Sequence, residues 1–142
     1  MNVLTENVLG AVFEVSNTLG CGFLEKVYQR ALLTELRLRG IRATSEASFV
    51  VTYKGRPVGN YFADLLVEDT LVVEVKCVQH LGNGDTAQCL NYLRASGRTV
   101  CLLVNFQHPK VEWRRIVRGL PEPELLDHLG LEQCPDALEV QL

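Results

Sequence analysis

The sequence predicts a single α/β domain in which two helices precede three strands, a third helix and a fourth strand. The first 40 residues carry apolar side chains three and four positions apart, which is the period of a helix. Residues 47–78 are instead rich in β-branched and aromatic side chains separated by turn residues, as strands are. A helical pattern and an apolar run follow at 85–105. The length of 142 residues fits one domain. We expect its four strands to form one mixed sheet flanked by helices.

The N-terminal part is expected to form two helices. Residues 3–19 form an amphipathic pattern, which Gly20-Cys21-Gly22 interrupts. A second helical pattern runs from Phe23 to Leu36, and Gly40 is suited to end it as a C-terminal cap.

Three strands are expected next, at 48–53, 61–67 and 71–78. Residues 54–57 read as a turn between the first two strands because they include Gly and Pro. Only Glu68-Asp69-Thr70 separates the second strand from the third. This short connection predicts that the second and third strands pair as an antiparallel hairpin.

The last predicted helix and strand complete a crossover. Asp85 or Thr86 can cap a helix that runs to about Ser96, and Gly97 ends it. The apolar run from Thr99 to Asn105 indicates a strand buried on both faces. A strand, a helix and a second strand in this order predict a right-handed crossover with parallel strands.

Charge divides the chain into a body and a tail. Residues 1–119 contain all 14 Lys and Arg against 11 acids, a net charge of +3, whereas residues 120–142 contain six acids and no Lys or Arg. We therefore interpret 1–119 as the folded domain. We interpret 120–142 as an acidic, partly flexible C-terminal tail that is disordered in part or holds a short helix at 122–129.

Several functional classes are disfavoured by what the sequence lacks. No apolar run approaches the roughly 20 residues that span a bilayer, and the first ten residues lack the layout of a signal peptide, so we expect a cytoplasmic protein without membrane contact. The five cysteines form no CxxC pair and the three histidines are scattered. We expect reduced thiols packed as small apolar side chains rather than a zinc or iron–sulfur site.

Three charged residues stand where the strand pattern calls for apolar ones: Asp64, Glu74 and Lys76. Glu74 and Lys76 are two apart, so they point to the same face of their strand. If the hairpin is symmetrical about Asp69, paired residues have numbers that sum to 138, which places Asp64 directly opposite Glu74. The Cβ atoms of such a pair are about 4.5–5.5 Å apart.

Two carboxylates held this close repel each other, and burial makes their ionisation more costly still. A divalent cation between them relieves both effects, and hard oxygen ligands favour Mg²⁺ or Mn²⁺. Lys76 would then orient the attacking water or stabilise charge on a phosphorane. The alternative is an ordinary ion pair, in which Asp64 and Glu74 flank Lys76 on a half-exposed face of the sheet.

Asp64 followed by Glu74-Val75-Lys76 resembles the D-x(n)-ExK signature of the PD-(D/E)XK nuclease superfamily, and the predicted element order is similar to its core. Residues 22–28 resemble the motif that names the GxxExxY family, a bacterial branch of that superfamily. Residues 63–69, 87–93 and 102–106 also resemble that family, so the resemblance covers residues 4–118. It implies a restriction-endonuclease-like α-β-β-β-α-β core with an extra N-terminal helix.

The resemblance also implies roles for the site residues. Asp64 and Glu74 would be metal ligands, the backbone carbonyl of Val75 a third ligand, and Lys76 the catalytic lysine. Glu25 would point into the same site from its helix, where it could hold a second metal or orient Lys76. The alternative for Glu25 is a surface salt bridge with a nearby basic residue.

Gln88 and Tyr92 are four residues apart and therefore share a helical face. They resemble the QxxxY element of exonucleases related to the nuclease domain of bacterial recombination helicases, in which such residues touch DNA or the site. The alternative is ordinary packing on the helix face.

The leading functional hypothesis is a Mg²⁺- or Mn²⁺-dependent nuclease that cleaves DNA by direct attack of a metal-positioned water. The runner-up is a catalytically weak or inactive module that keeps the fold and binds nucleic acid or a protein. An RNA-directed enzyme would use the same chemistry. Many enzymes of this superfamily work as dimers or in larger assemblies, so a homodimer or larger assembly is compatible with the sequence.

Overall fold

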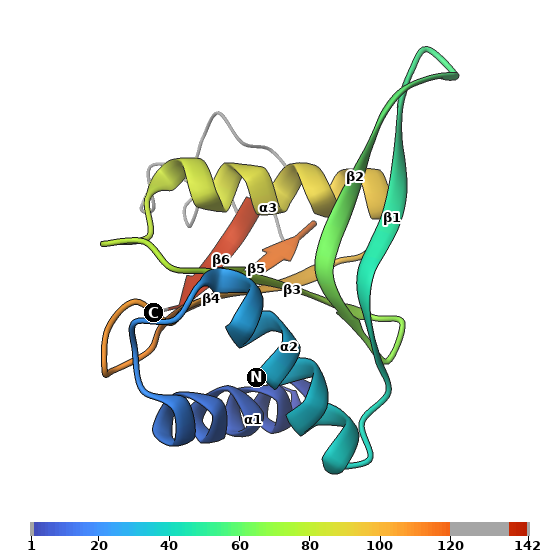
Figure 1. The fold of residues 1–142 in the computed structure, drawn as a ribbon. Coiled ribbons are helices and arrows are strands. Elements are labelled where there is room, and N and C mark those ends of the chain that lie inside the picture. Colours follow the sequence, from blue (N-terminus) through green and yellow to red (C-terminus); the bar gives the residue numbers. More distant parts are fainter. Residues whose placement is uncertain (1, 120–136, 142) are drawn as a thin grey trace.

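A computed structural model of the chain describes residues 2–119 and 137–141 (Figure 1). The elements are α1 (Val3–Leu19), α2 (Glu25–Leu38), β1 (Ala43–Tyr53), β2 (Arg56–Val67), β3 (Leu71–Lys76), α3 (Asn83–Ser96), β4 (Val100–Asn105), β5 (Glu112–Arg118) and β6 (Ala137–Gln141). The strands form one sheet in the order β1-β2-β3-β4-β5-β6. Only β3 and β4 pair parallel, and the other neighbours are antiparallel.

The sheet lies between two helical layers, with α1 and α2 on one face and α3 on the other (Figure 1). Each face has its own apolar cluster. Tyr28, Leu102 and Phe106 belong to the cluster under α1 and α2, and Leu90 and Leu103 belong to the cluster under α3. The central strands β3 and β4 are therefore covered on both faces, as the apolar run at 99–105 predicts.

The order of helices and strands confirms the predicted α/β fold, and β3 and β4, which flank α3 in the chain, pair parallel as predicted. The predicted number of four strands was wrong, because β5 and β6 extend the sheet beyond β4. β5 was missed because it contains several Arg residues. Two of these side chains fold back to backbone carbonyls: Arg114 donates to Leu81 at 2.8 Å and Arg118 donates to Leu93 at 3.0 Å.

The start of α3 also differs from the prediction. The cap residue is Gly82 rather than Asp85 or Thr86. Asp85 occupies the third helical position and its carboxylate accepts from the backbone N–H of Gly82 at 2.9 Å. The acidic side chain therefore stabilises the helix N-terminus from within the first turn.

The antiparallel register of β2 and β3 places the predicted site. Leu65, Leu66 and Val67 pair with Val73, Val72 and Leu71, so paired residues sum to 138 as predicted. The turn between them is tight, with positive φ of 50° at Glu68 and 54° at Asp69. The paired residues end at Leu65 and Val73, one position before Asp64 and Glu74, whose side chains lie close enough to shift each other's pKa.

β2 changes its packing at Asp64. Leu65 and Val67 pack in the cluster under α1 and α2, whereas Ala63 packs in the cluster under α3. Glu46, the residue of β1 level with Asp64, has a φ of 55°, outside the usual range of a strand. Asp64 thus lies where the hairpin turns from one layer of the fold toward the other.

β1 and β2 continue beyond this point as a long hairpin that extends past α3 (Figure 1). Its two-residue turn has positive φ at Lys54 (49°) and Gly55 (78°), the geometry favoured in such hairpins. All side chains at 50–60 are exposed. We call residues 50–62 the arm.

Of the predicted tail, residues 137–141 form β6, which pairs antiparallel with β5. The helix predicted at 122–129 lies outside the described residues. Within residues 2–119 and 137–141, no helix is long and apolar enough to cross a membrane. Four cysteines in this part of the chain are free thiols, and Cys89 and Cys101 are buried in the cluster under α3.

Candidate active site

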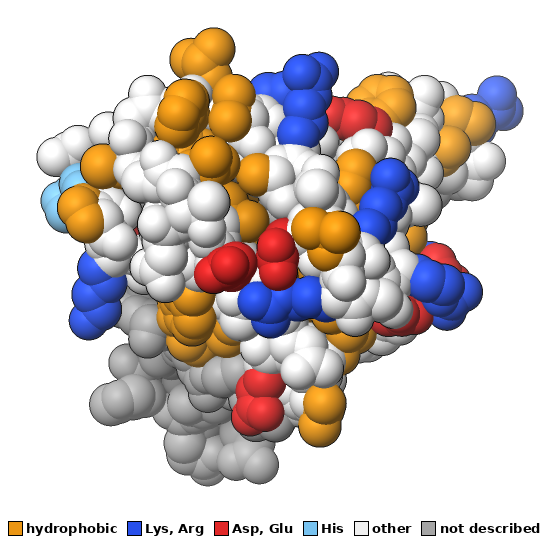
Figure 2. Space-filling model, turned by 60° about the horizontal axis from the view of Figure 1, so that its bottom comes forward, with side chains coloured by type: hydrophobic (Ala, Val, Ile, Leu, Met, Phe, Trp, Pro, Cys, Tyr) orange, Lys and Arg blue, Asp and Glu red, His pale blue; other side chains and the backbone are white. Residues whose placement is uncertain are grey.

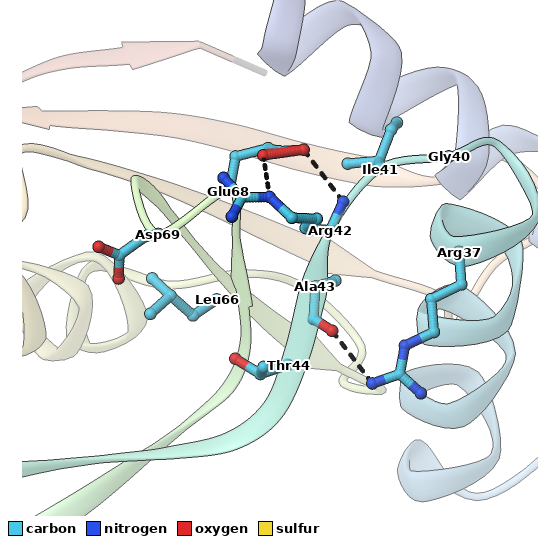
Figure 3. Close-up of a pocket in the computed structure, with 9 residues that line it drawn as sticks. All are labelled: Arg37, Gly40, Ile41, Arg42, Ala43, Thr44, Leu66, Glu68 and Asp69. Atoms are coloured by element: carbon cyan, nitrogen blue, oxygen red, sulfur yellow. Dashed lines mark hydrogen bonds and ion pairs between the residues drawn. The ribbon is translucent and has the colours of Figure 1, made fainter.

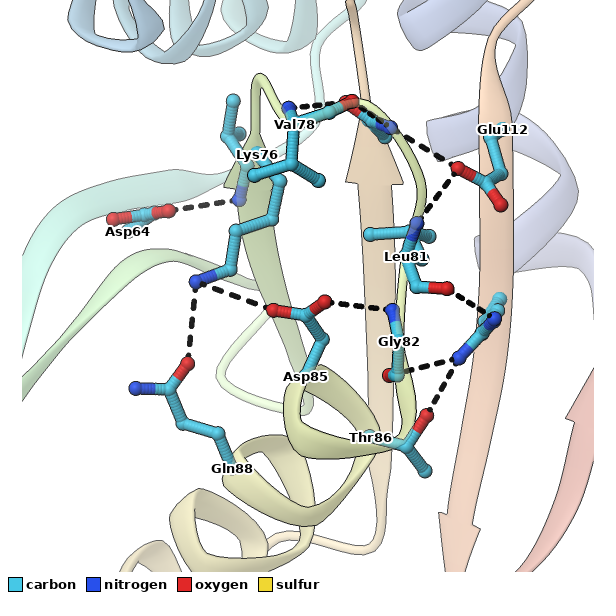
Figure 4. Close-up of polar contacts among 12 residues, drawn as sticks. Asp64, Lys76, Val78, Leu81, Gly82, Asp85, Thr86, Gln88 and Glu112 are labelled. Atoms are coloured by element: carbon cyan, nitrogen blue, oxygen red, sulfur yellow. Dashed lines mark hydrogen bonds and ion pairs between the residues drawn. The ribbon is translucent and has the colours of Figure 1, made fainter.

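The centre of the candidate site is the pair of carboxyl groups of Asp64 and Glu74. Glu74 is only 5% exposed, and its Oε1 is buried without a hydrogen-bond partner in the described part of the structure. Asp64 is half-buried, and its Oδ2 accepts from the backbone N–H of Val75 at 2.7 Å (Figure 4). Such an unpaired buried oxygen is rare in folded proteins and is the kind of group found at catalytic and ion-binding sites.

The two groups oppose each other's ionisation. Burial, and then the charge of Asp64, raise the pKa of Glu74 to about 10. Burial also raises the pKa of Asp64, although hydrogen bonds from Val75 and Glu74 act in the opposite direction. Glu74 therefore keeps a proton at neutral pH when no cation is present.

Lys76 lies two residues beyond Glu74 at the end of β3. Its ammonium donates to Gln88 Oε1 at 3.2 Å and lies 4.0 Å from Asp85 Oδ1 (Figure 4). Its charge lowers the pKa of both Asp64 and Glu74, but by less than burial raises it. Lys76 is thus held by α3 rather than by the carboxylate pair, and the simple ion pair considered from the sequence is not what forms.

Gln88, which contacts Lys76, and Tyr92 lie four residues apart on α3. A hydrogen bond to Gln88 lowers the pKa of Tyr92, but burial and the charge of Glu74 outweigh it and raise that pKa to about 12. The Tyr92 ring stacks on Tyr61 with centroids 4.1 Å apart, and the Tyr61 hydroxyl donates to the Tyr92 carbonyl at 2.6 Å. Both predicted residues therefore lie on the side of α3 that adjoins the carboxylate pair.

Glu25 lies at the edge of this group. It is the first residue of α2 and is exposed, and its charge contributes, after burial, to raising the pKa of the Cys77 thiol. In the described residues, no hydrogen bond joins Glu25 to Asp64, Glu74 or Lys76. Lys26 instead pairs with Glu46, and no ion pair of Glu25 with Lys26 or Arg30 forms among the described residues, so the alternative of a surface salt bridge is not seen either.

A network of buried polar groups fixes the loop between β3 and α3. The side chain of Asn105 in β4 accepts from Val78 N at 3.0 Å and donates to Val78 O at 2.8 Å and to Glu112 Oε1 at 3.0 Å (Figure 4). Glu112 also accepts from Leu81 N at 3.0 Å. These contacts set where α3 begins and so hold Gln88 against Lys76.

Sequence reasoning missed Gln29, which is 4% exposed on the inner face of α2. Its Nε2 donates to the backbone carbonyl of Asp64 and to Glu46 Oε1, both at 3.1 Å. Gln29 therefore joins α2 to the hairpin at the point where Asp64 is placed. The signal was a polar residue four positions after Glu25, on the same helical face as Leu32 and Leu36.

Replacing Gln29 with leucine is expected to lower the free energy of unfolding by about 1–3 kcal/mol, because it leaves the Asp64 carbonyl buried without its donor. Urea denaturation at neutral pH measures this change. Gln107→Leu is the matched control, since Gln107 is exposed. Equal unfolding midpoints for Gln29→Leu and the control would show that the contact does not hold Asp64.

A separate cavity of about 540 Å³ lies at the other end of the β2–β3 hairpin, beside its turn (Figure 3). Its two arginines already have partners: Arg42 Nε donates to Glu68 Oε2 at 3.0 Å, and Arg37 donates to the Ala43 carbonyl at 3.1 Å. Figure 2 shows acidic and basic side chains interspersed on the side of the molecule that carries α1 and α2. Among the described residues, none that lines this cavity has a buried polar atom without a partner, unlike Glu74.

The chain is similar to known proteins in sequence and in fold. A family model described as the PD-(D/E)XK nuclease superfamily matches residues 2–116. The crystal structure of SSO0001 is similar with a TM-score of 0.54 and 14% identity, over 94% of this chain and 89% of that one, which shows a shared fold. The crystal structure of an alkaline exonuclease (LHK-Exo) from Laribacter hongkongensis is similar with a TM-score of 0.44 and 18% identity, over 85% and 81% of the two chains. Comparison with curated proteins finds no match.

Proposed function

The chain belongs to the PD-(D/E)XK nuclease superfamily, and on this premise we propose that it is a Mg²⁺- or Mn²⁺-dependent phosphodiesterase that hydrolyses DNA. The observation that carries the proposal is the buried Asp64–Glu74 pair, with an unpaired oxygen on Glu74 and Lys76 on the same strand. RNA is the alternative substrate, because the same groups would act on either backbone.

The donors of this site fit a hard divalent cation. No group of three or more His, Cys, Asp and Glu side chains gathers around one point in the described part of the chain, so the protein would supply two carboxylates. Mg²⁺ is commonly held by one or two carboxylates and keeps several waters. We propose Asp64, Glu74 and the backbone carbonyl of Val75 as ligands, and Glu25, at the start of α2, as a residue that would act on a second cation.

The remaining residues would orient the substrate and stabilise the transition state. A bound divalent cation would lower the pKa of a coordinated water and offset charge on the phosphate. The Lys76 ammonium would donate hydrogen bonds to the phosphoryl oxygens as negative charge develops on them. Gln88 would act as a positioning residue, because its side chain fixes the Lys76 ammonium. Tyr92 would contact substrate next to Gln88.

We further propose that the chain belongs to the GxxExxY branch, on the basis of Gly22, Glu25 and Tyr28. Tyr28 is fully buried and stacks on Phe106 with centroids 4.7 Å apart. Its hydroxyl donates to the Gly20 carbonyl at 2.7 Å and accepts from the Phe23 N–H at 3.2 Å. The motif tyrosine therefore anchors the loop that presents Glu25 at the start of α2.

Purified protein is expected to cleave DNA with Mg²⁺ or Mn²⁺, and poorly with Ca²⁺, because Ca²⁺ takes more ligands in looser geometry. Asp64→Asn and Lys76→Ala are each expected to lower the cleavage rate by about 10²–10⁴-fold, the usual range for loss of one catalytic group. Initial rates on single- and double-stranded DNA and on RNA measure this. Glu14→Gln, an exposed change on α1, is the control.

Cleavage that persists undiminished in Asp64→Asn would contradict the proposed site. Wild-type protein that binds nucleic acid but cleaves none of the three substrates with any metal would favour the non-catalytic module instead.

A further inference from the structure

The arm carries apolar side chains that the fold does not use. Val50, Tyr53 and Val58 are 50%, 63% and 62% exposed, although each lies on a regular strand. The arm and its base, residues 47–63, also contain two basic residues, Lys54 and Arg56, and no acid. An exposed apolar surface rimmed by positive charge marks an interaction site rather than part of the core.

A groove separates the arm from α3. It has a volume of about 550 Å³ and is lined by Val50, Val51, Thr52, Tyr61, Asn91, Tyr92, Arg94 and Ala95. Its lining is mainly apolar and aromatic, and it contains one cation and no acid. Arg94 donates to Asn91 Oδ1 at 3.2 Å, which places its guanidinium on the α3 wall.

The groove lies next to the α3 residue that holds Lys76. Tyr92 lines the groove and lies one helical turn after Gln88 on α3. Gln88 in turn accepts from the Lys76 ammonium at 3.2 Å. On the groove side, ring contacts extend from Tyr92 to Tyr61 and on to Phe49, with centroids 4.1 Å and 5.3 Å apart.

We infer that the groove between the arm and α3 binds a single strand of nucleic acid and leads it to the Asp64–Glu74 pair. This inference rests on the proposed function. Unstacked bases gain from apolar and aromatic walls, and each base–aromatic stack contributes about 1–3 kcal/mol. A duplex hides its bases and is bound by surfaces that are more polar and far more positive than this one. Lys54, Arg56 and Arg94 would contact phosphates along the path.

The test is equilibrium binding of a fluorescent twelve-nucleotide dT strand and of a duplex of equal length, measured by anisotropy in EDTA so that no cleavage occurs. The double variant Val51→Glu/Arg94→Glu is expected to bind the single strand at least about tenfold more weakly, because it places charge against bases and removes a phosphate contact. The matched control is Lys110→Glu, an exposed change on the loop before β5. It is expected to bind within about twofold of wild type.

Three results would overturn the inference: unchanged affinity in the double variant, equal losses for single strand and duplex, or a change in oligomeric state by light scattering without a loss of single-strand affinity. The last would assign the arm to a protein interface. If the double variant does not fold, the test uses a photo-crosslinking side chain at position 50 of the otherwise unchanged protein. The same side chain at position 110 is the control. Crosslinks to the dT strand from 50 but not from 110 support the groove, and no crosslink from 50 contradicts it.

Failure of this inference is distinguishable from failure of the proposed function. Cleavage that depends on Asp64, together with unchanged binding in the double variant, would leave the nuclease and remove the groove. Groove-dependent binding by a protein that cleaves nothing would do the reverse.

Discussion

Replacing Glu74 with glutamine is expected to make the metal-free protein more stable at pH 8 and to abolish cleavage. Burial and the charge of Asp64 raise the pKa of Glu74 to about 10, from its ordinary value of 4.5. Between pH 4.5 and about 10, Glu74 keeps in the folded state a proton that it has lost in the unfolded state. Stability from this group is therefore complete below pH 4.5 and falls as the pH rises toward 10. Glutamine carries no such penalty and offers no anionic ligand.

Urea denaturation in EDTA between pH 5.5 and 8 measures this effect. In that window the carboxylates whose pKa is lowered, Glu46, Glu68 and Glu112, are ionised in both states and add no slope. The wild type is expected to lose up to about 1.4 kcal/mol per pH unit, the value for one proton, and Glu74→Gln is expected to be much flatter. Glu14→Gln should follow the wild type. A wild-type stability that does not vary with pH would contradict a buried, protonated Glu74.

Divalent cations are expected to offset the cost of ionising Glu74 in proteins that keep both carboxylates. Mn²⁺ at one hundred times its Kd should stabilise the folded state by about 2.7 kcal/mol, seen as a rise in Tm. Asp64→Asn and Glu74→Gln should each bind Mn²⁺ about a hundredfold more weakly or worse, since even indirect partners of metal ligands contribute 10–100-fold to affinity. Glu14→Gln is again the control. Equal Mn²⁺-induced shifts in all four proteins would mean that the cation binds elsewhere.

The position of Asp64 and Glu74 could be predicted because local rules decide it. A short connection fixes the register of an antiparallel hairpin, and the observed pairs of β2 and β3 obey the sum of 138. The period of two then places Glu74 and Lys76 on one face of β3. Burial of β3 and β4 on both faces could also be predicted from the sequence, because Leu71–Lys76 and Val100–Asn105 are nearly continuous apolar runs.

Contacts between distant elements could not be read in this way. Gln29 and Glu46 meet only because α2 packs across the base of the hairpin, and nothing in their spacing of 17 residues signals it. β5 escaped detection because its arginine side chains obscure the strand pattern, although Arg114 and Arg118 find backbone partners. Glu25 was expected to point into the site, and in the described part of the chain it has no hydrogen bond to Asp64, Glu74 or Lys76.

The change of packing at Asp64 could not be read from the sequence either, because it too depends on the three-dimensional arrangement of the elements. The strand pattern treats β2 as uniform, yet Ala63 and Leu65 pack in different clusters. Three-dimensional twist and the unusual backbone of Glu46 produce that change. The pairs between β2 and β3 end at Leu65 and Val73, and on the other side of Asp64 strand β2 belongs to the hairpin with β1.

The measurement that tests the metal site most directly is calorimetric titration of Mn²⁺ into the metal-free protein at pH 7, in two buffers of different ionisation enthalpy. The wild type is expected to bind Mn²⁺ and release about one proton, because Glu74 must lose its proton to become a ligand. Glu14→Gln should behave identically, and Glu74→Gln should bind weakly and release none. Binding of Mn²⁺ to Glu74→Gln with wild-type affinity would contradict the assignment of Asp64 and Glu74 as the metal centre.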